Sequence, residues 1–326
     1  MKKILILGIS GFIGRNLLEF IFSHNLHSQY HFIGVDKNPN IYPLDPLPLH
    51  ATTSSFEFIT LNLLDFPSLV DLVANLRPDY IINLAGTFVS EDWETLVKVN
   101  ATLPKVIIEA CLQHHQQIEK ILLIGSAAEY GIPYACPIKE DSELRPINLY
   151  GLSKVFQTNI FNYLKTKHQV PVVMARTFNI IGPNQSNFLS VGNFISQLKK
   201  ISPNISPNGE IFVGNLDSKR DFLDIRDVIQ MYFNILFKGG VGEIYNVCSK
   251  QSINIQAILK NLIKISQKKV TIINQNNYFT NNTTKSSTTA DIIQGDNSKI
   301  TEHNLGIMQL TPLMDSLEYA YSRTLI

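Results

Sequence analysis

The sequence predicts an α/β fold, a doubly wound parallel sheet with helices on both faces, followed by a smaller C-terminal α/β unit. Short apolar runs alternate with helix-length segments through the first half of the chain, a rhythm typical of βαβ units. The alternation stops beyond Asn179, where turn-rich and polar stretches begin. The 326 residues are 44% hydrophobic and 17% charged, which suits a globular protein with a sizeable core and excludes wholesale disorder.

Six apolar runs have the length and composition of buried strands. They are residues 4–7, 32–35, 56–61, 80–85, 121–125 and 172–175. The segment between the first two runs carries apolar residues at helical spacing, namely Ile13, Leu17, Phe20 and Ile21. We therefore expect the first crossover helix to pack this stripe against the sheet.

The remaining segments are read from their prolines, polar residues and apolar spacing. Four prolines within residues 38–55 forbid a regular helix or a central strand and predict an exposed loop. The polar, low-complexity stretch 274–290 is expected to be a surface loop, with a substrate lid as the alternative. Helices are expected at 224–237 and 253–265, and the run 243–247 is a candidate strand that returns to the first sheet.

Charge and cysteine content exclude several classes of partner. With 28 Lys and Arg against 27 Asp and Glu, the net charge is +1, so no global field is available to hold a nucleic acid or an anionic membrane. Cys111, Cys136 and Cys248 suggest neither a disulfide framework nor a metal pair, which fits a reducing cytoplasm. The adjacent His114 and His115 would face different ways on a helix, so we expect no metal site. No apolar run approaches the roughly 18 residues of a membrane span.

A glycine-rich loop joins the first strand to the first helix. Gly8, Gly11 and Gly14 allow a tight turn and a close approach to a diphosphate, while the helix N-terminus attracts its charge. Asp36, at the end of the second strand, can accept both hydroxyls of an adenosine ribose and would repel a 2′-phosphate, so NAD is favoured over NADP. Lys37 keeps NADPH possible. In the alternative, the glycines make a plain turn and Asp36 caps a loop.

These features predict a Rossmann-type dinucleotide-binding domain and a second, substrate-binding domain. The first would comprise residues 1–178, with residues 221–248 returning to it, and the second residues 179–220 and 249–326.

Three polar side chains are candidates for the chemistry. Tyr150 and Lys154 are four residues apart, so on a helix they share one face, and Ser126 lies at the carboxyl end of a predicted strand. A phenol with a pKa near 10 needs a nearby positive charge to exchange a proton at neutral pH. Lys154 would supply that charge and hold the nicotinamide ribose, while Ser126 would hydrogen-bond the substrate oxygen.

These motifs resemble the extended short-chain dehydrogenase/reductases, the family of nucleotide-sugar epimerases, dehydratases and 4-ketoreductases. The resemblance covers nearly the whole chain. Besides the glycine loop and the three catalytic candidates, it rests on Asn62, Leu63, the sequence NLAG at 83–86, Asn100 and the sequence RTFNIIGP at 176–183.

The resemblance implies two sets of ligand-binding residues. The cofactor set would be Gly8, Gly11, Phe12, Ile13, Gly14, Asp36, Asn62, Leu63, Leu84, Ala85, Gly86, Asn100, Tyr150, Lys154 and Phe178. The substrate set would be Thr87, Ser126, Asn179, Asn193, Arg220 and Lys285. In such proteins Asn179 and Arg220 would hold the diphosphate; the alternative for Arg220 is an ion pair with Asp221 or Asp224.

The C-terminal half is similar to the branch that contains GDP-mannose 4,6-dehydratase and GDP-4-keto-6-deoxymannose reductase. This similarity lies in residues 213–228, 242–249 and 295–300 and implies a GDP-sugar. Ser286 and Ser287 stand where that branch has an Arg-Pro pair on the diphosphate, with Lys285 alongside as a substitute charge. Sugars carried by TDP or CDP therefore stay open.

The residues after Ser126 bear on the type of reaction. Dehydratases of this family carry an acidic group there, whereas this chain has Ala127 and Ala128, whose methyl groups cannot do acid–base work. Glu129 would point elsewhere if the segment is extended. We therefore predict an NAD(P)H-dependent 4-ketoreductase, with a 4-epimerase and a non-catalytic NAD(P) sensor as alternatives.

The resemblance also implies a homodimer formed by helices near residues 91–113 and 150–165. Val97, Ile107 and Ile108 suit such an interface, and they equally suit packing on the sheet.

Overall fold

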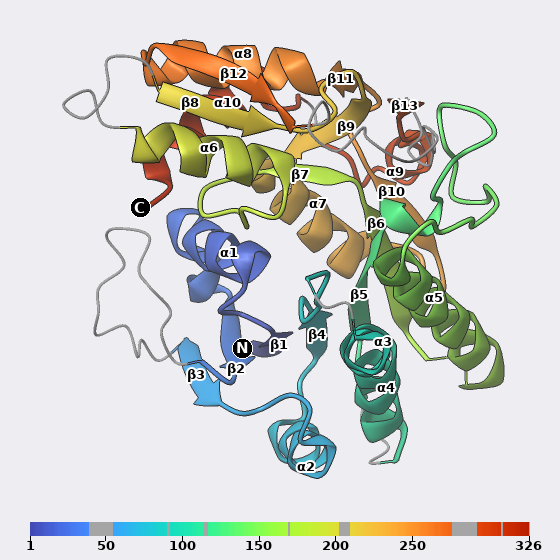
Figure 1. Cartoon of the computed structure of the whole chain (residues 1–326). Coiled ribbons are helices and arrows are strands. Elements are labelled where there is room, and N and C mark those ends of the chain that lie inside the picture. The colour runs from blue at the N-terminus through green and yellow to red at the C-terminus, as the bar shows by residue number, and fades with distance from the viewer. Residues whose placement is uncertain are drawn as a thin grey trace.

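The computed structural model describes residues 1–38, 55–89, 92–113, 117–168, 170–201, 209–275, 292–307 and 309–325. Within these residues the largest sheet has seven strands in the order β10-β6-β5-β4-β1-β2-β3, all paired in parallel (Figure 1). The strands are β1 (Lys2–Leu7), β2 (Tyr30–Asp36), β3 (Phe56–Thr60), β4 (Tyr80–Asn83), β5 (Lys120–Ser126), β6 (Val172–Thr177) and β10 (Ile244–Val247). The six predicted runs all lie in this sheet, which confirms the predicted fold class.

Helices cover both faces of the sheet. The first face packs against α1 (Phe12–Ser23) and α7 (Ile225–Lys238). The second packs against α2 (Phe66–Leu76), α4 (Leu103–Gln113) and α5 (Leu149–His168). Strand β1 divides its residues accordingly, because Ile4 and Ile6 enter one core cluster and Leu5 and Leu7 the other. Burial on both faces explains why the predicted strands are continuous apolar runs rather than alternating ones.

A smaller group of elements lies beyond β6, at the top of Figure 1. Strand β9 (Lys219–Asp224) pairs with β7 (Asn179–Ile181), β11 (Ser252–Asn254) and β13 (Ile292–Ile293), while β8 (Gly209–Val213) pairs with β12 (Val270–Asn274). A third apolar cluster packs among α6 (Ser190–Lys200), α8 (Ile255–Ser266) and α10 (Leu313–Arg323). The shorter elements are η1 (Leu26–Ser28), α3 (Trp93–Val97), η2 (Lys98–Thr102), η3 (Ala127–Glu129) and α9 (Ser298–Glu302).

The chain returns to the large sheet after β9, since α7 packs on one face and β10 lies beside β6. We propose a boundary between the two domains near residue 178, because the smaller group of elements begins with β7.

Several sequence-based expectations concern residues that the structure does not describe. The predicted proline-rich loop, His114 and His115, and Lys285, Ser286 and Ser287 lie wholly or largely outside the described residues. None of the helices in the described part of the chain is both long and apolar enough to cross a membrane.

Candidate active site

The glycine loop lies between β1 and α1 at the carboxyl edge of the sheet. Gly8 has a φ of +84°, and a Cβ on it would come within 2.7 Å of the Ala85 backbone nitrogen. A Cβ on Gly14 would lie 2.3 Å from the Ile9 carbonyl oxygen. Both positions therefore require glycine. Gly8 brings the glycine loop close to the loop after β4, and Gly14 brings the first turn of α1 close to the Ile9 backbone.

The start of α1 has the donor groups that a diphosphate needs. Helix geometry leaves the first amides without partners inside the helix, and no side chain of the described residues caps them. Phe12 and Ile13 supply amides of this first turn. The close glycine backbone and these amides fit the diphosphate of a dinucleotide.

Asp36 lies beside this loop at the end of β2. Its carboxylate accepts hydrogen bonds from the backbone N–H groups of Ser10, at 3.1 Å, and Lys37, at 2.8 Å. The side chain thus does cap the loop, as the alternative interpretation expected. Each carboxylate oxygen can accept more than one hydrogen bond, and Asp36 is partly exposed, so the same group can also accept ribose hydroxyls.

Asn62 and Leu63, two of the predicted cofactor residues, have different environments. Asn62 is exposed and accepts a hydrogen bond from the Leu64 N–H at 3.2 Å. Leu63 is only 9% exposed and packs in the second core cluster. Leu84, after β4, donates its N–H to the Leu7 carbonyl and so extends the edge of the sheet toward the loop that contains Ala85.

Asn100 holds the loop after β4. Its Oδ1 accepts from the Thr87 N–H at 3.0 Å, and its Nδ2 donates to the Thr87 carbonyl at 2.8 Å and to the Ser153 hydroxyl at 2.9 Å. A Cβ on Gly86 would lie 3.5 Å from Asn100 Oδ1 and 3.7 Å from Lys154 Nζ. Asn100 therefore ties this loop to α5 beside the catalytic candidates.

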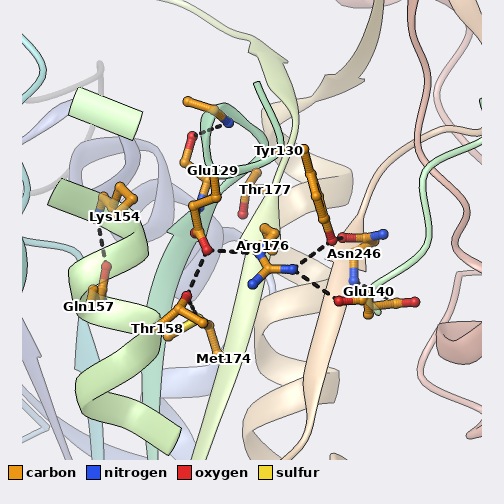
Figure 2. Close-up of polar contacts among 12 residues, drawn as sticks. Glu129, Tyr130, Glu140, Lys154, Gln157, Thr158, Met174, Arg176, Thr177 and Asn246 are labelled. Carbon is orange, nitrogen blue, oxygen red and sulfur yellow. Dashed lines mark hydrogen bonds and ion pairs between the residues drawn. The ribbon is translucent and has the colours of Figure 1, made fainter. Parts of the chain in front are cut away.

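Ser126, Tyr150 and Lys154 are brought together by β5 and α5. The Ser126 side chain is close enough to the Tyr150 phenol to lower its pKa by hydrogen bonding. Lys154 is 4% exposed, and its ammonium donates to the Ile124 carbonyl at 2.9 Å. It also donates to the Gln157 side chain at 3.0 Å (Figure 2). The three groups that the sequence singled out thus occupy one corner of the sheet edge.

Burial controls the protonation of Tyr150 and Lys154. It raises the pKa of Tyr150; the Ser126 hydrogen bond lowers that pKa, and the negative charge of Glu129 raises it. Burial lowers the pKa of Lys154 to about 8, and the charge of Glu129 opposes this shift. Tyr150 therefore holds its proton at neutral pH, while Lys154 titrates within a unit or so of neutrality.

The segment that contains Glu129 is not extended, which was the condition under which Glu129 would point elsewhere. Residues 127–129 form a turn of 3₁₀ helix, and Glu129 is fully buried. Its Oε1 accepts from the Ser126 N–H at 2.8 Å, and the Ser126 hydroxyl accepts in return from the Ala128 N–H at 3.2 Å. The Ser-x-x-Glu spacing is a capping-box pattern, and it could have revealed this turn from the sequence alone.

Arg176 is a second buried charge that the sequence did not single out. It lies on β6, is 1% exposed, and its Nε donates to Glu129 Oε2 at 3.0 Å. Its Nη1 donates to the Tyr130 hydroxyl at 2.7 Å and to the Glu140 carbonyl at 3.2 Å, and Tyr130 donates onward to Asn246 on β10 (Figure 2). This network joins three strand ends directly behind Ser126.

The predicted substrate residues come from separate elements. Asn179 is exposed at the start of β7 and donates its Nδ2 to the Asp221 carbonyl at 2.9 Å. Arg220 is on β9, which pairs with β7, so these two residues lie on neighbouring strands. Asn193 lies on α6, where its Nδ2 donates to the Asn187 carbonyl.

Other groups near these strands are engaged in the fold. Phe178 is buried, and its N–H donates to the Val247 carbonyl at 3.0 Å. Asp224 forms an ion pair with Arg226 at 2.7 Å. Asp221 accepts hydrogen bonds from Ser249 and Gly295, and burial raises its pKa to about 6.

Comparison with known proteins places this geometry in a family. The family model described as the NAD dependent epimerase/dehydratase family matches residues 4–248. The chain belongs to this family. It is therefore an NAD(P)-dependent enzyme of oxidoreductase type, and the resemblance inferred from the motifs is confirmed.

Among curated members of the family, GDP-6-deoxy-D-mannose reductase from Pseudomonas aeruginosa is 29% identical over 278 residues, which is 83% of this chain and 83% of the relative. GDP-6-deoxy-D-talose 4-dehydrogenase from Aggregatibacter actinomycetemcomitans is 27% identical over 280 residues, 85% of this chain and 84% of the relative. Human dTDP-D-glucose 4,6-dehydratase is 25% identical over 271 residues, 81% of this chain and 74% of the relative.

Solved structures of the family share the fold. UDP-glucuronic acid 4-epimerase from Bacillus cereus, in complex with UDP-glucuronic acid and NAD, has a TM-score of 0.80 and 25% identity over 98% of both chains. RMD from Pseudomonas aeruginosa, complexed with NADPH, has a TM-score of 0.78 and 24% identity over 99% of this chain and 98% of the other.

Proposed function

We propose that this enzyme is a nucleotide-diphospho-sugar 4-ketoreductase that reduces a GDP-4-keto-6-deoxyhexose with NADH or NADPH. The observation that carries the proposal is the convergence of Ser126, Tyr150 and Lys154 where the end of β5 meets α5, with Ala127 and Ala128 where an elimination would need acidic groups. The similarity to a GDP-6-deoxy-D-mannose reductase and to a GDP-6-deoxy-D-talose 4-dehydrogenase supports a reaction at C4 of a GDP-sugar.

The cofactor would lie along the carboxyl edge of the sheet. The first-turn amides of α1 would bind its diphosphate and Asp36 its adenosine ribose, with Lys154 near the second ribose. When bound, the reduced nicotinamide supplies the hydride that C4 of the sugar accepts. The remaining steps belong to side chains of this chain.

Tyr150 would donate its proton to the C4 carbonyl oxygen, so that one hydride and one proton convert the ketone to a hydroxyl. The Ser126 hydroxyl would hydrogen-bond this oxygen as negative charge develops on it. The Lys154 ammonium would stabilise the phenolate that the transfer leaves behind. The raised pKa of Tyr150 keeps the proton available before the transfer.

The diphosphate of the sugar would be held by Asn179 and Arg220, on neighbouring strands, and by Lys285. A guanidinium suits this role because it is planar, permanently charged and able to form two parallel hydrogen bonds. Asn193 and Thr87 would contact the rest of the substrate. We favour GDP as the nucleotide of the substrate, with TDP and CDP as alternatives.

We also propose a homodimer formed through α3, α4 and α5. Phe156 and Tyr163 on α5 are 43% and 55% exposed, and Trp93 on α3 packs edge-on against Phe156 with ring centroids 5.4 Å apart. Ile107 and Ile108 do not contribute to this surface, because both are buried in the core cluster beneath α4.

A 4-epimerase is the second candidate. Such an enzyme also needs no acidic group after Ser126, and the fold is similar to that of UDP-glucuronic acid 4-epimerase. In that reaction the hydride taken from C4 returns to the opposite face, so no cofactor is consumed.

A turnover assay separates these functions. The protein is incubated with NADH or NADPH and a GDP-4-keto-6-deoxyhexose, and cofactor oxidation is followed by absorbance while the sugar product is identified by NMR. A ketoreductase oxidises one cofactor per GDP-6-deoxyhexose formed. Interconversion of GDP-hexoses without net cofactor use indicates the epimerase, and cofactor binding without turnover indicates a sensor.

A further inference from the structure

We propose that Glu129 is a positioning residue of the active site. Its buried carboxylate holds the strand end that carries Ser126 against the helix that carries Tyr150 and Lys154, and sets a negative charge between Lys154 and Arg176. The inference rests on the proposed function in assigning the three groups to the reaction, and its first readout, the pKa of Lys154, does not depend on turnover.

The hydrogen bonds of Glu129 join three elements. Oε1 accepts from the Ser126 N–H at 2.8 Å, at the end of β5. Oε2 accepts from Arg176 Nε on β6 at 3.0 Å and from the Thr158 hydroxyl on α5 at 2.6 Å (Figure 2). Ser126 and α5 therefore share one rigid acceptor.

The hydrogen bond from Thr158 to Glu129 lies on the helix face that carries the catalytic side chains. Thr158 follows Lys154 by four residues and Tyr150 by eight, so all three lie on one face of the helix. Fixing Thr158 fixes the rotation of α5 about its axis, and with it the direction in which the phenol and the ammonium point. A strand end and a helix face that met only through apolar contacts would lack this directional constraint.

The backbone makes room for the carboxylate. A Cβ on Gly125 would lie 2.8 Å from Glu129 Oε1. Burying a glutamate and an arginine that are 0% and 1% exposed is costly, and it is tolerated only where the groups are paired and their hydrogen bonds are made. Both conditions hold here, so the Glu129–Arg176 pair can be accommodated in the protein interior.

Charged and titratable groups face Glu129 from each element packed against it. The groups that face it are Arg176 on β6, Tyr130, which follows Glu129 in the chain, and Tyr150 and Lys154 on α5. Glu140 lies beyond Arg176, and the Tyr232 phenol of α7 lies near Tyr150. Figure 2 shows Glu129 between Lys154 and Arg176. Among these groups Glu129 is the carboxylate whose charge acts on both Lys154 and Tyr150.

The test is the pKa of Lys154 in Glu129→Gln, read by NMR from the ¹³Cε resonance of labelled lysine and assigned by its loss in Lys154→Met. Removing the negative charge favours the neutral amine, so we expect this pKa to fall by about one unit. The alkaline limb of the kcat profile moves to lower pH by a similar amount. A merely structural role would lower kcat and leave both values in place.

Glu119→Gln is the matched control. Glu119 precedes β5 at its other end, where its carboxylate pairs with Lys2 and accepts from Tyr80, so the Lys154 pKa should not change. If Glu129→Gln alone does not fold, the same resonance is read in Glu129→Gln/Arg176→Met, which removes both members of the buried ion pair. Its shift is smaller and of the same sign, because Arg176 lies on the far side of Glu129.

An unchanged Lys154 pKa in a folded variant overturns the inference. The proposed function fails separately if Glu129→Gln lowers the Lys154 pKa as expected but the wild-type protein does not reduce 4-keto sugars.

Discussion

The phenol of Tyr150 has two opposing influences on its proton. Burial raises its pKa, and the hydrogen bond with Ser126 lowers it. Together they leave a phenol that cannot release and regain a proton near neutral pH unless a positive charge lies nearby. Lys154 therefore has to be protonated when Tyr150 gives up its proton, and its own pKa of about 8 sets the limit.

The need for a protonated Lys154 predicts a loss of kcat on the alkaline side. Lys154 carries its positive charge below its pKa and loses it above, so kcat for ketone reduction should fall as pH rises through about 8. The measurement is kcat against pH at saturating substrate and cofactor. A kcat that stays level up to about pH 10, the ordinary range of a free phenol or amine, contradicts the role given to Lys154.

Short elements around the site decide where these groups point. The glycine loop between β1 and α1 approaches Ala85 closely, and η3 turns Glu129 inward behind Ser126. The glycine loop was predictable because three glycines follow a strand at a known spacing. The turn at η3 was missed because a run of two alanines and a glutamate has no periodicity, and only the capping-box spacing indicates it.

At the element scale, Gly14→Ala should disrupt the first turn of α1. The new Cβ would lie 2.3 Å from the Ile9 carbonyl oxygen, so the loop must shift. We expect the free energy of unfolding to fall by about 1–3 kcal/mol and the affinity for NAD(H) to fall with it, measured by thermal unfolding and by fluorescence titration.

Gly214→Ala is the control for this change. No heavy atom lies within 4 Å of a Cβ at Gly214 and its φ is not positive, so stability and cofactor affinity should stay at wild-type values. Equal behaviour of the two variants would show that the glycine loop does not need its close packing.

Across the whole molecule, the site joins parts of the chain that are distant in sequence. The large sheet was predictable because its strands are buried on both faces and read as continuous apolar runs. The Glu129–Arg176 pair was not, because its partners are 47 residues apart and meet only when β5 and β6 pair. The placement of Asn179 beside β9 likewise depends on the pairing of β7 with β9.

This arrangement predicts that the smaller group of elements binds the nucleotide sugar and the large sheet binds the cofactor. Arg220→Gln should raise KM for the nucleotide sugar by roughly 10–100-fold, the loss expected for a charge-assisted hydrogen bond, while the Kd for NAD(H) stays unchanged. Arg77→Gln, at the exposed end of α2, is the control and should alter neither. An equal loss of cofactor affinity in Arg220→Gln contradicts a role confined to the substrate.

The most direct test of the account follows the hydride itself. The protein is given NADH or NADPH deuterated at the transferring position, together with a GDP-4-keto-6-deoxyhexose, and the product is analysed by NMR and mass spectrometry. We expect one deuterium at C4 of the product for each cofactor oxidised. A product without deuterium, or sugar conversion that leaves the labelled cofactor unconsumed, contradicts it.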